Sequence, residues 1–328
     1  MFESFLKQHD QAAWARAVEA LLPDIHEVDR NAVQIWFHFF PLALAEAIAE
    51  IPDRAELERT LRLDGNYRLA DQSDTSHWFL YGHRYWPQVK AAIIKRAESG
   101  TAPASLDLAA VVREIATDAG GDISLMLGIA AVGLMTLQQI GLTAFRAEQG
   151  PAGRPRQGYG AQAGHDVHKT PAQVLAARRR NDGQGIAGLW RGIRSQYTVT
   201  FDERRDDARF RVINQQHLTT ASALDTRTHE PGPRTCMEGP IPVECRTASC
   251  GTCWVGVLGG AERLSDVETL EAKRMKEFGY INTTESKPLI RLACSALAAG
   301  NVSIVIPPWN GFIGTRTGFR ETSGARRG

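Results

Sequence analysis

The stretch Cys245-Arg-Thr-Ala-Ser-Cys250-Gly-Thr-Cys253 contains three of the five cysteines of this 328-residue chain. Its cysteines are spaced C-x4-C-x2-C, and Cys294 follows after a gap of 40 residues. Four thiolates are what a [2Fe–2S] cluster needs, two on each iron. The four-residue gap lets the chain point backbone N–H groups at the sulfurs, and Gly251 permits a close approach of the backbone. The motif therefore predicts a metal site made by Cys245, Cys250, Cys253 and Cys294.

Several short strands and one helix are predicted around this stretch. Alternating or β-branched runs indicate strands at 197–201, 209–213, 254–258 and 301–306, of which the first two could form a hairpin. Ser265 and Glu268 have the spacing of a capping box, which predicts a helix over Ser265–Glu277. Few helices among several strands are typical of an α+β domain, here covering about 197–308.

These 112 residues resemble the plant-type and adrenodoxin-type [2Fe–2S] ferredoxins. The resemblance is carried by IPVECRTASCGTCWVGVLGG at 241–260, by Leu264-Ser265-Asp266, and by IRLACSALAAGNVSIVIPP at 290–308. It implies a β-grasp fold, with a mixed sheet crossed by one helix and the cluster near the surface at one end. It also implies that the cluster ligands are Cys245, Cys250, Cys253 and Cys294. The protein would then move one electron at a time and have no catalytic residue of its own.

The chain departs from the family pattern in three respects. Ala248 stands between the first two cysteines, where plant ferredoxins usually carry glycine. The 40-residue gap before Cys294 is longer than the plant-type gap, and we expect the extra residues, about 278–288, to form a loop near the helix. Over 197–308, 13 basic residues oppose 14 acidic ones, whereas free ferredoxins of this family are usually strongly acidic. A fixed subunit therefore fits better than a shuttle that docks through an acidic face.

Cys236 lies nine residues before Cys245 and is expected to be a small buried apolar residue. Exchanging it for Cys245 as a ligand would spoil the four-residue spacing. Structural zinc is the alternative metal, but such sites prefer two C-x2–4-C pairs and Cys294 has no nearby cysteine. Because the cysteines are too few for a disulfide scaffold and the N-terminus has no apolar signal segment, we expect a cytoplasmic protein.

Residues 1–146 are predicted to form an all-α domain. Apolar residues recur at helical spacing from Ala12 to Leu22 and again from Ala32 to Ile51, and Asp29 or Asn31 could cap the second of these helices. Further helices are expected at Arg54–Leu61, at Pro87–Ala97 with proline in its first turn, and at Leu106–Thr117. Nothing in this region carries a recognisable functional motif, so we interpret it as a docking domain.

The stretch Ile123–Phe145 has no charged residue and is long enough to span a bilayer. It is diluted by two glutamines and three glycines, which favours the central helix of the domain over a membrane helix. Contact with lipid or with a partner subunit is the alternative. Gly128 and Gly133 would permit close helix packing in either case.

Residues 147–196 are predicted to be an extended basic linker, rich in Gly, Pro and Gln. Over 146–196, nine basic residues oppose three acidic ones, a net charge of +6. The segment is either a solvated connection or an arm for an acidic partner or an anionic membrane surface. The last residues, 309–328, form a Gly/Arg-rich tail that we expect to be flexible.

Other cofactor motifs are weak or absent in the sequence. No C-x-x-C-H occurs, so covalent haem is excluded, but His38, His77 or His83 could ligate a b-type haem. We expect these histidines to serve packing or capping, and we expect no metal at His165 and His168. There is no G-x-G-x-x-G after a strand and no phosphate-binding G-x-x-x-x-G-K-[ST], so the chain is no self-contained NAD(P)H reductase.

These observations predict a one-electron carrier subunit of a larger oxidoreductase complex, which relays electrons through a single [2Fe–2S] cluster. Helical regions fused to such ferredoxins resemble accessory iron–sulfur proteins of aerobic uptake hydrogenases, which implies a [NiFe] hydrogenase as partner and a quinone-linked acceptor, with peripheral membrane association. The alternatives are an enzyme component with a second cofactor such as haem, and a redox-sensing module. Lys plus Arg (38) balance Asp plus Glu (37), so nucleic acid is not an expected partner.

Overall fold

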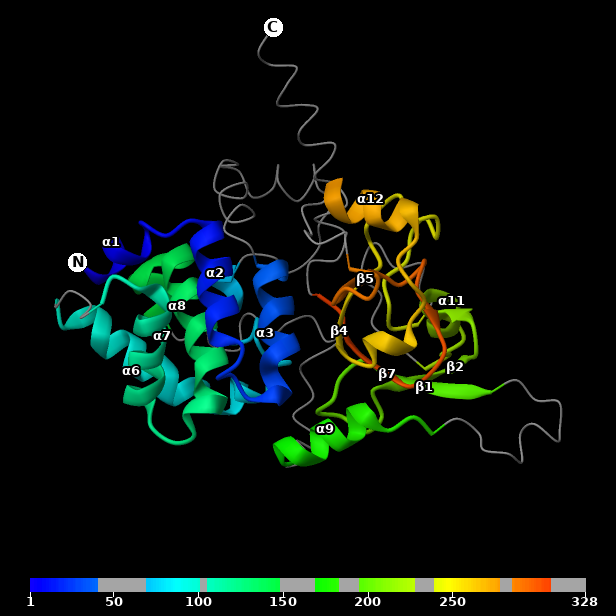
Figure 1. Ribbon diagram of the computed structural model, residues 1–328, viewed down its shortest axis with the longest axis horizontal. Coiled ribbons are helices and arrows are strands. Elements are labelled where there is room, and N and C mark those ends of the chain that lie inside the picture. Colours follow the sequence, from blue (N-terminus) through cyan, green and yellow to red (C-terminus); the bar gives the residue numbers. More distant parts are fainter. Residues whose placement is uncertain are drawn as a thin grey trace, which may run out of the picture. The chain divides into compact units, whose positions relative to one another are not determined.

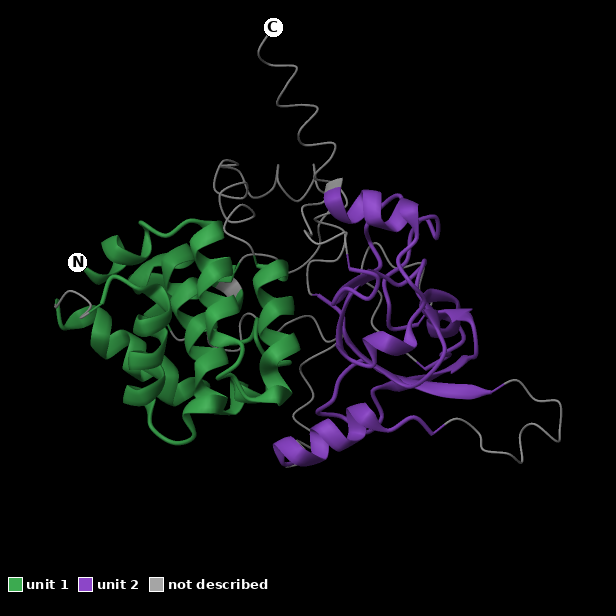
Figure 2. Ribbon diagram, viewed as in Figure 1, with its two compact units in different colours: residues 1–52, 66–153 green, residues 53–65, 154–328 purple. Residues whose placement is uncertain are grey.

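The chain folds into two compact units, which Figure 2 shows in different colours. The computed structural model describes residues 1–40, 69–100, 105–147, 169–182, 195–227, 239–277 and 285–307. Of these, the residues up to Ala147 belong to the first unit and those from Lys169 onward to the second. Several sequence predictions fall outside the described residues: the helix at 54–61, Cys236, His165, His168, residues 278–284 and the tail.

The first unit is helical throughout its described residues, as predicted (Figure 1). Asp10, Asp107 and Asp122 cap its helices by accepting hydrogen bonds from main-chain N–H groups, and Pro87 lies in a first turn. The elements are α1 (Phe2–Leu6), α2 (Gln11–Leu21), α3 (Glu27–Phe39), the 3-10 helices η1 (Leu69–Gln72) and η2 (Tyr81–Tyr85), α6 (Trp86–Glu98), α7 (Leu108–Ala119) and α8 (Ile123–Arg146).

The start of α3 differs from the prediction, which placed Asp29 or Asn31 at the cap. The helix is capped by His26, whose Nδ1 accepts from the N–H of Val28 at 3.2 Å. Asp29 lies inside the helix with no exposed surface. Its carboxylate accepts from the N–H groups of Tyr81 and Gly82 at 2.6 and 2.7 Å. Asp29 therefore joins α3 to η2 instead of capping its own helix.

The apolar stretch at 123–145 forms α8, the central helix of this unit. Every residue from Leu125 to Leu137 is buried. A Cβ atom on Gly128 would lie 2.6 Å from Val33 Cγ2, and one on Gly133 would lie 2.6 Å from Ile93 Cδ1, so both glycines permit close packing. The helix is long and apolar enough to cross a membrane, but most of its apolar surface is covered within the unit. The structure therefore favours the central-helix interpretation.

The second unit contains a mixed five-stranded sheet in the order β2–β1–β7–β4–β5. β1 pairs with β2 in the predicted antiparallel hairpin and with β7 in parallel, and β4 is antiparallel to β7 and β5. β3 and β6 pair separately. The strands are β1 (Gln196–Thr200), β2 (Arg209–Ile213), β3 (Gln216–His217), β4 (Trp254–Gly259), β5 (Ile290–Leu292), β6 (Leu297–Ala298) and β7 (Val302–Val305). The helices are α9 (Pro171–Arg179), α11 (Leu218–Ala223), the 3-10 helix η4 (Ala261–Arg263) and α12 (Thr269–Glu277). This α+β arrangement confirms the predicted fold class and is consistent with a ferredoxin-like fold.

The helix expected from Ser265 begins later, at Thr269. Ser265 bonds to β6 instead of capping a helix: its N–H donates to the carbonyl oxygen of Leu297, and its hydroxyl accepts from the N–H of Leu297 at 3.1 Å. The predicted capping box therefore does not form, because the strand competes for the serine.

The predicted linker at 147–196 contains the helix α9, which the composition did not indicate. A capping box between Thr170 and Gln173 begins it. Arg178 forms an ion pair with Glu203 at 2.7 Å, in which both side chains are largely buried. At its end, the Arg263 guanidinium donates to the carbonyl oxygens of Arg178, Arg179 and Arg180. These contacts fix α9 to the second unit.

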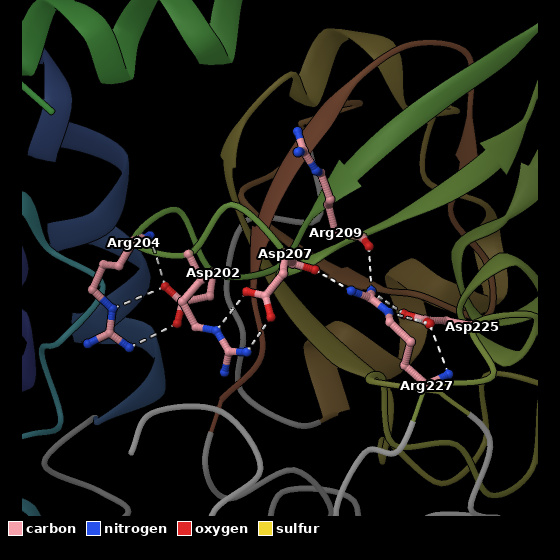
Figure 3. A network of polar contacts seen from close by, with 7 residues as sticks. Asp202, Arg204, Asp207, Arg209, Asp225 and Arg227 are labelled. Carbon is pink, nitrogen blue, oxygen red and sulfur yellow. Dashed lines mark hydrogen bonds and ion pairs between the residues drawn. The ribbon is translucent and has the colours of Figure 1, made fainter. Parts of the chain in front are cut away.

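Hydrogen bonds from Arg227 connect the β1–β2 turn to the residues that follow α11 (Figure 3). Arg227 donates to the carbonyl oxygens of Asp207 and Arg209 at 2.5 and 2.6 Å. The hydrogen bond from Arg205 lowers the pKa of the Asp207 carboxyl. The three ion pairs are local, since each joins residues two apart in the sequence, so the Arg227 hydrogen bonds are what fixes the chain where it leaves α11. The pairs are Arg204–Asp202, Arg205–Asp207 and Arg227–Asp225.

Candidate metal centre

The β4–β5 ladder brings the last two cysteines of the motif together. Cys253 immediately precedes β4, and Cys294 follows β5 by two residues. Trp254 lies opposite Leu292 in the ladder, and the N–H of Ala293 donates to the carbonyl oxygen of Cys253 at 3.0 Å. The electrostatic interaction between the two thiols shows that they are close neighbours. The pairing of β4 with β5 therefore brings Cys294 next to Cys253, although 40 residues separate them in the sequence.

The loop before β4 winds its backbone around the first two cysteines. The Sγ of Cys245 accepts from the N–H groups of Thr247, Ser249 and Cys250 at 3.3–3.4 Å. The Sγ of Cys250 accepts from the N–H of Thr252 at 3.5 Å. The spacing predicted such donors, and they stabilise negative charge on the sulfurs whether or not iron is bound.

Ala248 adopts the left-handed backbone that glycine would favour at this position. Its φ is +57°, beside +56° for Arg246 and +71° for Gly251. For a non-glycine residue this conformation costs about 1–2 kcal/mol. The N–H of Ala248 bonds to the sulfur of Cys294 and helps to lower the pKa of that thiol. Alanine at position 248 thus adopts the backbone conformation that glycine would favour, at a cost in strain, and the course of the loop is unchanged.

The thiol pKa values follow the placement of these donors. Burial raises the pKa of Cys245, but the hydrogen bonds from Ser249, Thr247 and Cys250 outweigh it and bring the pKa to about 6. Burial raises the pKa of Cys250. In the buried pair, the hydrogen bond between the thiols raises the pKa of Cys253 and lowers that of Cys294. Cys245 and Cys294 are therefore the first to become the thiolates that iron needs.

The four cysteines provide the donor set that a cluster of two irons needs. A [2Fe–2S] cluster takes two thiolates on each iron, and the motif offers four cysteines. Cys253 interacts with both Cys294 and Cys250, and Cys294 interacts with Cys245, so the four thiols gather at one site. The chemistry and arrangement of the four cysteines therefore fit the cluster.

A buried ion pair supports the strand that leads to Cys294, and sequence reasoning did not identify it. Arg291 in β5 and Glu271 in α12 are both fully buried, and their side chains meet at 2.8 and 2.9 Å. The carboxylate also accepts from the N–H of Leu292 at 2.8 Å. No pattern in the sequence marks this pair, because burial of a charge cannot be deduced from composition.

The histidines considered for haem have other partners. His77 is fully buried, its Nδ1 lies 2.9 Å from the Nδ1 of His83, and its Nε2 lies 3.2 Å from the carbonyl oxygen of Ser73. Both ring nitrogens of His77 are thus already bonded within the protein. The Nδ1 of His38 bonds to the carbonyl oxygen of Gln34 at 2.6 Å. These contacts match the expected roles in packing and capping.

The comparisons with known proteins agree with this geometry. The family model of the 2Fe-2S iron-sulfur cluster binding domain matches residues 214–299. Neither the search of curated proteins nor the search of solved structures gave a match. The matched segment contains all four cysteines of the motif and β3 to β6. Residues 214–299 therefore form a [2Fe–2S] ferredoxin domain, which gives the chain the role of an electron carrier. The second unit, which contains this domain, is called the ferredoxin unit below.

Proposed function

We propose that this chain is the one-electron carrier subunit of a larger oxidoreductase, with the helical unit as its docking piece. The observation that carries the proposal is that the cluster loop of the ferredoxin unit is exposed to solvent. The same chain also contains a separate helical unit. Arg246, Thr247 and Ser249 of the loop are exposed, and Cys245 and Cys250 are only partly buried. When bound, the cluster accepts and releases one electron, and this loop is the side on which a donor or acceptor can approach.

The charge balance supports a fixed partner over a transient one. The ferredoxin segment carries 13 basic and 14 acidic residues, so it lacks the strong field that steers short-lived encounters. A helical unit attached to the same chain can hold the partner instead, and it raises the effective concentration of the cluster at the partner's redox site.

For the partner itself, we propose a [NiFe] uptake hydrogenase, with a quinone-linked acceptor at a membrane surface. The support is the resemblance of the domain combination to accessory iron–sulfur proteins of such enzymes, together with the charge of +6 over 146–196. On this proposal the chain is cytoplasmic and associates with the membrane peripherally.

The test is anaerobic purification of the full chain from its source, followed by identification of co-purifying proteins. We expect a large metalloenzyme, and chemical cross-links from Lys7 or Lys95 of the helical unit in preference to Lys273 or Lys276 of α12. If the complex is a hydrogenase, hydrogen gas alone should generate the electron paramagnetic resonance (EPR) signal of the reduced cluster. A complex that hydrogen does not reduce would overturn the hydrogenase assignment and leave the carrier role intact.

Two other functions would give different results in the same experiment. A haem absorption band in the purified chain would indicate a second cofactor. A change in partner affinity on reduction, without turnover, would indicate a redox sensor. Cross-links confined to α12 would contradict the docking role of the helical unit.

A further inference from the structure

A hydrogen bond between two side chains other than the cysteines joins the beginning of the cluster loop to its end. The hydroxyl of Thr252 donates to Oε2 of Glu244 at 3.0 Å. Glu244 directly precedes the first cysteine of the motif and Thr252 directly precedes the third. Thr252 has no exposed surface, whereas Glu244 is exposed. The bond therefore anchors an exposed carboxylate to a buried side chain inside the loop.

The position of this carboxylate is set by the same residues that surround the sulfurs. Thr252 donates with its N–H to the Sγ of Cys250 and with its hydroxyl to Glu244. Glu244 is covalently next to Cys245, whose sulfur collects three N–H groups. The negative charge is thus held at the Cys245–Cys250 end of the loop, where the cysteines are only partly buried.

A charge held there acts on the transfer of an electron. Reduction adds one negative charge to the cluster, and a carboxylate at fixed short range opposes that addition. The N–H groups on the sulfurs act in the opposite sense, because they stabilise negative charge. A mobile surface carboxylate has less effect, since water and salt screen it and its side chain samples many positions.

We propose that Glu244 sets the reduction potential of the cluster to a lower value, and that Thr252 enables it to do so by holding its carboxylate in place. This inference rests on cluster binding by the four cysteines and does not depend on the partner proposed above. Its test therefore needs only the full chain with its cluster. Failure of the inference about Glu244 and Thr252 can be distinguished from failure of the proposal about the partner enzyme.

The first measurement compares Glu244→Gln with Glu262→Gln by anaerobic redox titration, followed through the EPR signal of the reduced cluster. Glutamine keeps the shape and the hydrogen-bond acceptor but removes the charge. Glu262 is the matched control, because it is 68% exposed, lies in the same unit and is paired with Arg263. We expect a more positive potential for Glu244→Gln and an unchanged one for Glu262→Gln. An unchanged potential in Glu244→Gln would overturn the proposal.

The second measurement tests the role of Thr252 through a double-mutant cycle. In Thr252→Val, which lacks the hydroxyl, the effect of Glu244→Gln on the potential should fall by at least half, whereas Thr252→Ser should preserve it. An equal effect in all backgrounds would mean that Glu244 acts without Thr252, and would overturn the holding role. If Thr252→Val does not take up the cluster, the bond is tested by amide hydrogen exchange in the cluster-free Glu244→Ala variant and in the cluster-free unchanged chain. Faster exchange of the N–H of Thr252 in the variant supports the bond. An unchanged exchange rate contradicts it.

Discussion

In the helical unit, the centre is occupied by α8, whose residues from Leu125 to Leu137 are all buried. In the ferredoxin unit, the corresponding interior includes the ion pair between Arg291 and Glu271, and the adjacent loop points backbone N–H groups at thiols. Apolar packing tolerates the absence of a cofactor, whereas thiolates gathered by a loop repel one another until metal neutralises them. The comparison teaches that the stability of the second unit should depend on iron as well as on its buried ion pair. That of the first unit should depend on packing and on the hydrogen bonds of Asp29, without any metal.

The largest expected effect is loss of the cluster from the ferredoxin unit alone. We expect two irons and two acid-labile sulfides per chain, and Cys250→Ser should abolish stable cluster binding, because the loop then offers one thiolate fewer to the irons. Iron and sulfide analysis after anaerobic purification provides the measurement, while far-UV circular dichroism should show the helices of the first unit unchanged.

The matched control for this prediction is Cys236→Ser, which should retain the cluster. Equal losses from the two variants would refute the ligand assignment. Loss of helical signal in Cys250→Ser would show instead that the two units are not independently stabilised.

The next largest effect concerns the buried ion pair. Glu271→Ala leaves the guanidinium of Arg291 buried without its partner, so the free energy of unfolding of the ferredoxin unit should fall by about 3–5 kcal/mol. Urea unfolding followed through the visible absorption of the cluster would measure it. The exposed Glu262→Ala should change this free energy by less than about 1 kcal/mol. Comparable effects from the two variants would show that the pair contributes no more than a surface contact.

The smallest effect is a pH dependence that belongs to the helical unit. Burial and the neighbouring His83 hold the pKa of His77 well below 6.5 in the folded state. As the pH falls below 6.5, the unfolded chain therefore binds a proton that the folded chain does not. The free energy of unfolding should be highest above pH 6.5 and decrease by at most about 1.4 kcal/mol per pH unit below it.

Urea titrations followed by the helical circular dichroism signal at several pH values would measure this decrease. His77→Gln should remove the proton-linked part of the slope, whatever it does to stability at neutral pH. His38→Gln, on a half-buried histidine of the same unit, should leave the slope in place. A slope that persists unchanged in His77→Gln would assign the dependence to other groups.

The sequence predicted the features that depend on spacing and periodicity. The cysteine motif indicated the loop with its N–H donors, and alternation located β1, β2, β4 and β7. The predictions of helix caps were wrong where side chains have a choice of hydrogen-bond partners. Ser265 has the right spacing to cap a helix but bonds to Leu297 of β6, and Asp29 crosses to η2 instead of capping α3. Such choices depend on tertiary neighbours, which local propensity does not contain.

The short elements of the site could not be predicted for a related reason. β3, β5 and β6 have two or three residues each, too few for a periodic signal, yet β5 is the strand that presents Cys294. The link between Thr252 and Glu244 joins a residue inside the cysteine motif to the residue that precedes it. Their types allow the bond, but only the path of the loop brings the hydroxyl to the carboxylate.

The attachment of α9 makes the residues from Lys169 onward part of the ferredoxin unit. Because Arg178 and Arg263 secure α9 to the ferredoxin unit, the chain between the described residues of the two units runs from Ala147 only to Lys169 and not to Ser195. Twenty-two peptide steps from Ala147 to Lys169 reach about 75 Å when fully stretched, less than half of what the whole segment to Ser195 would allow. On the docking proposal made above, the carrier can therefore serve only partners whose redox centre lies within that reach of the helical unit.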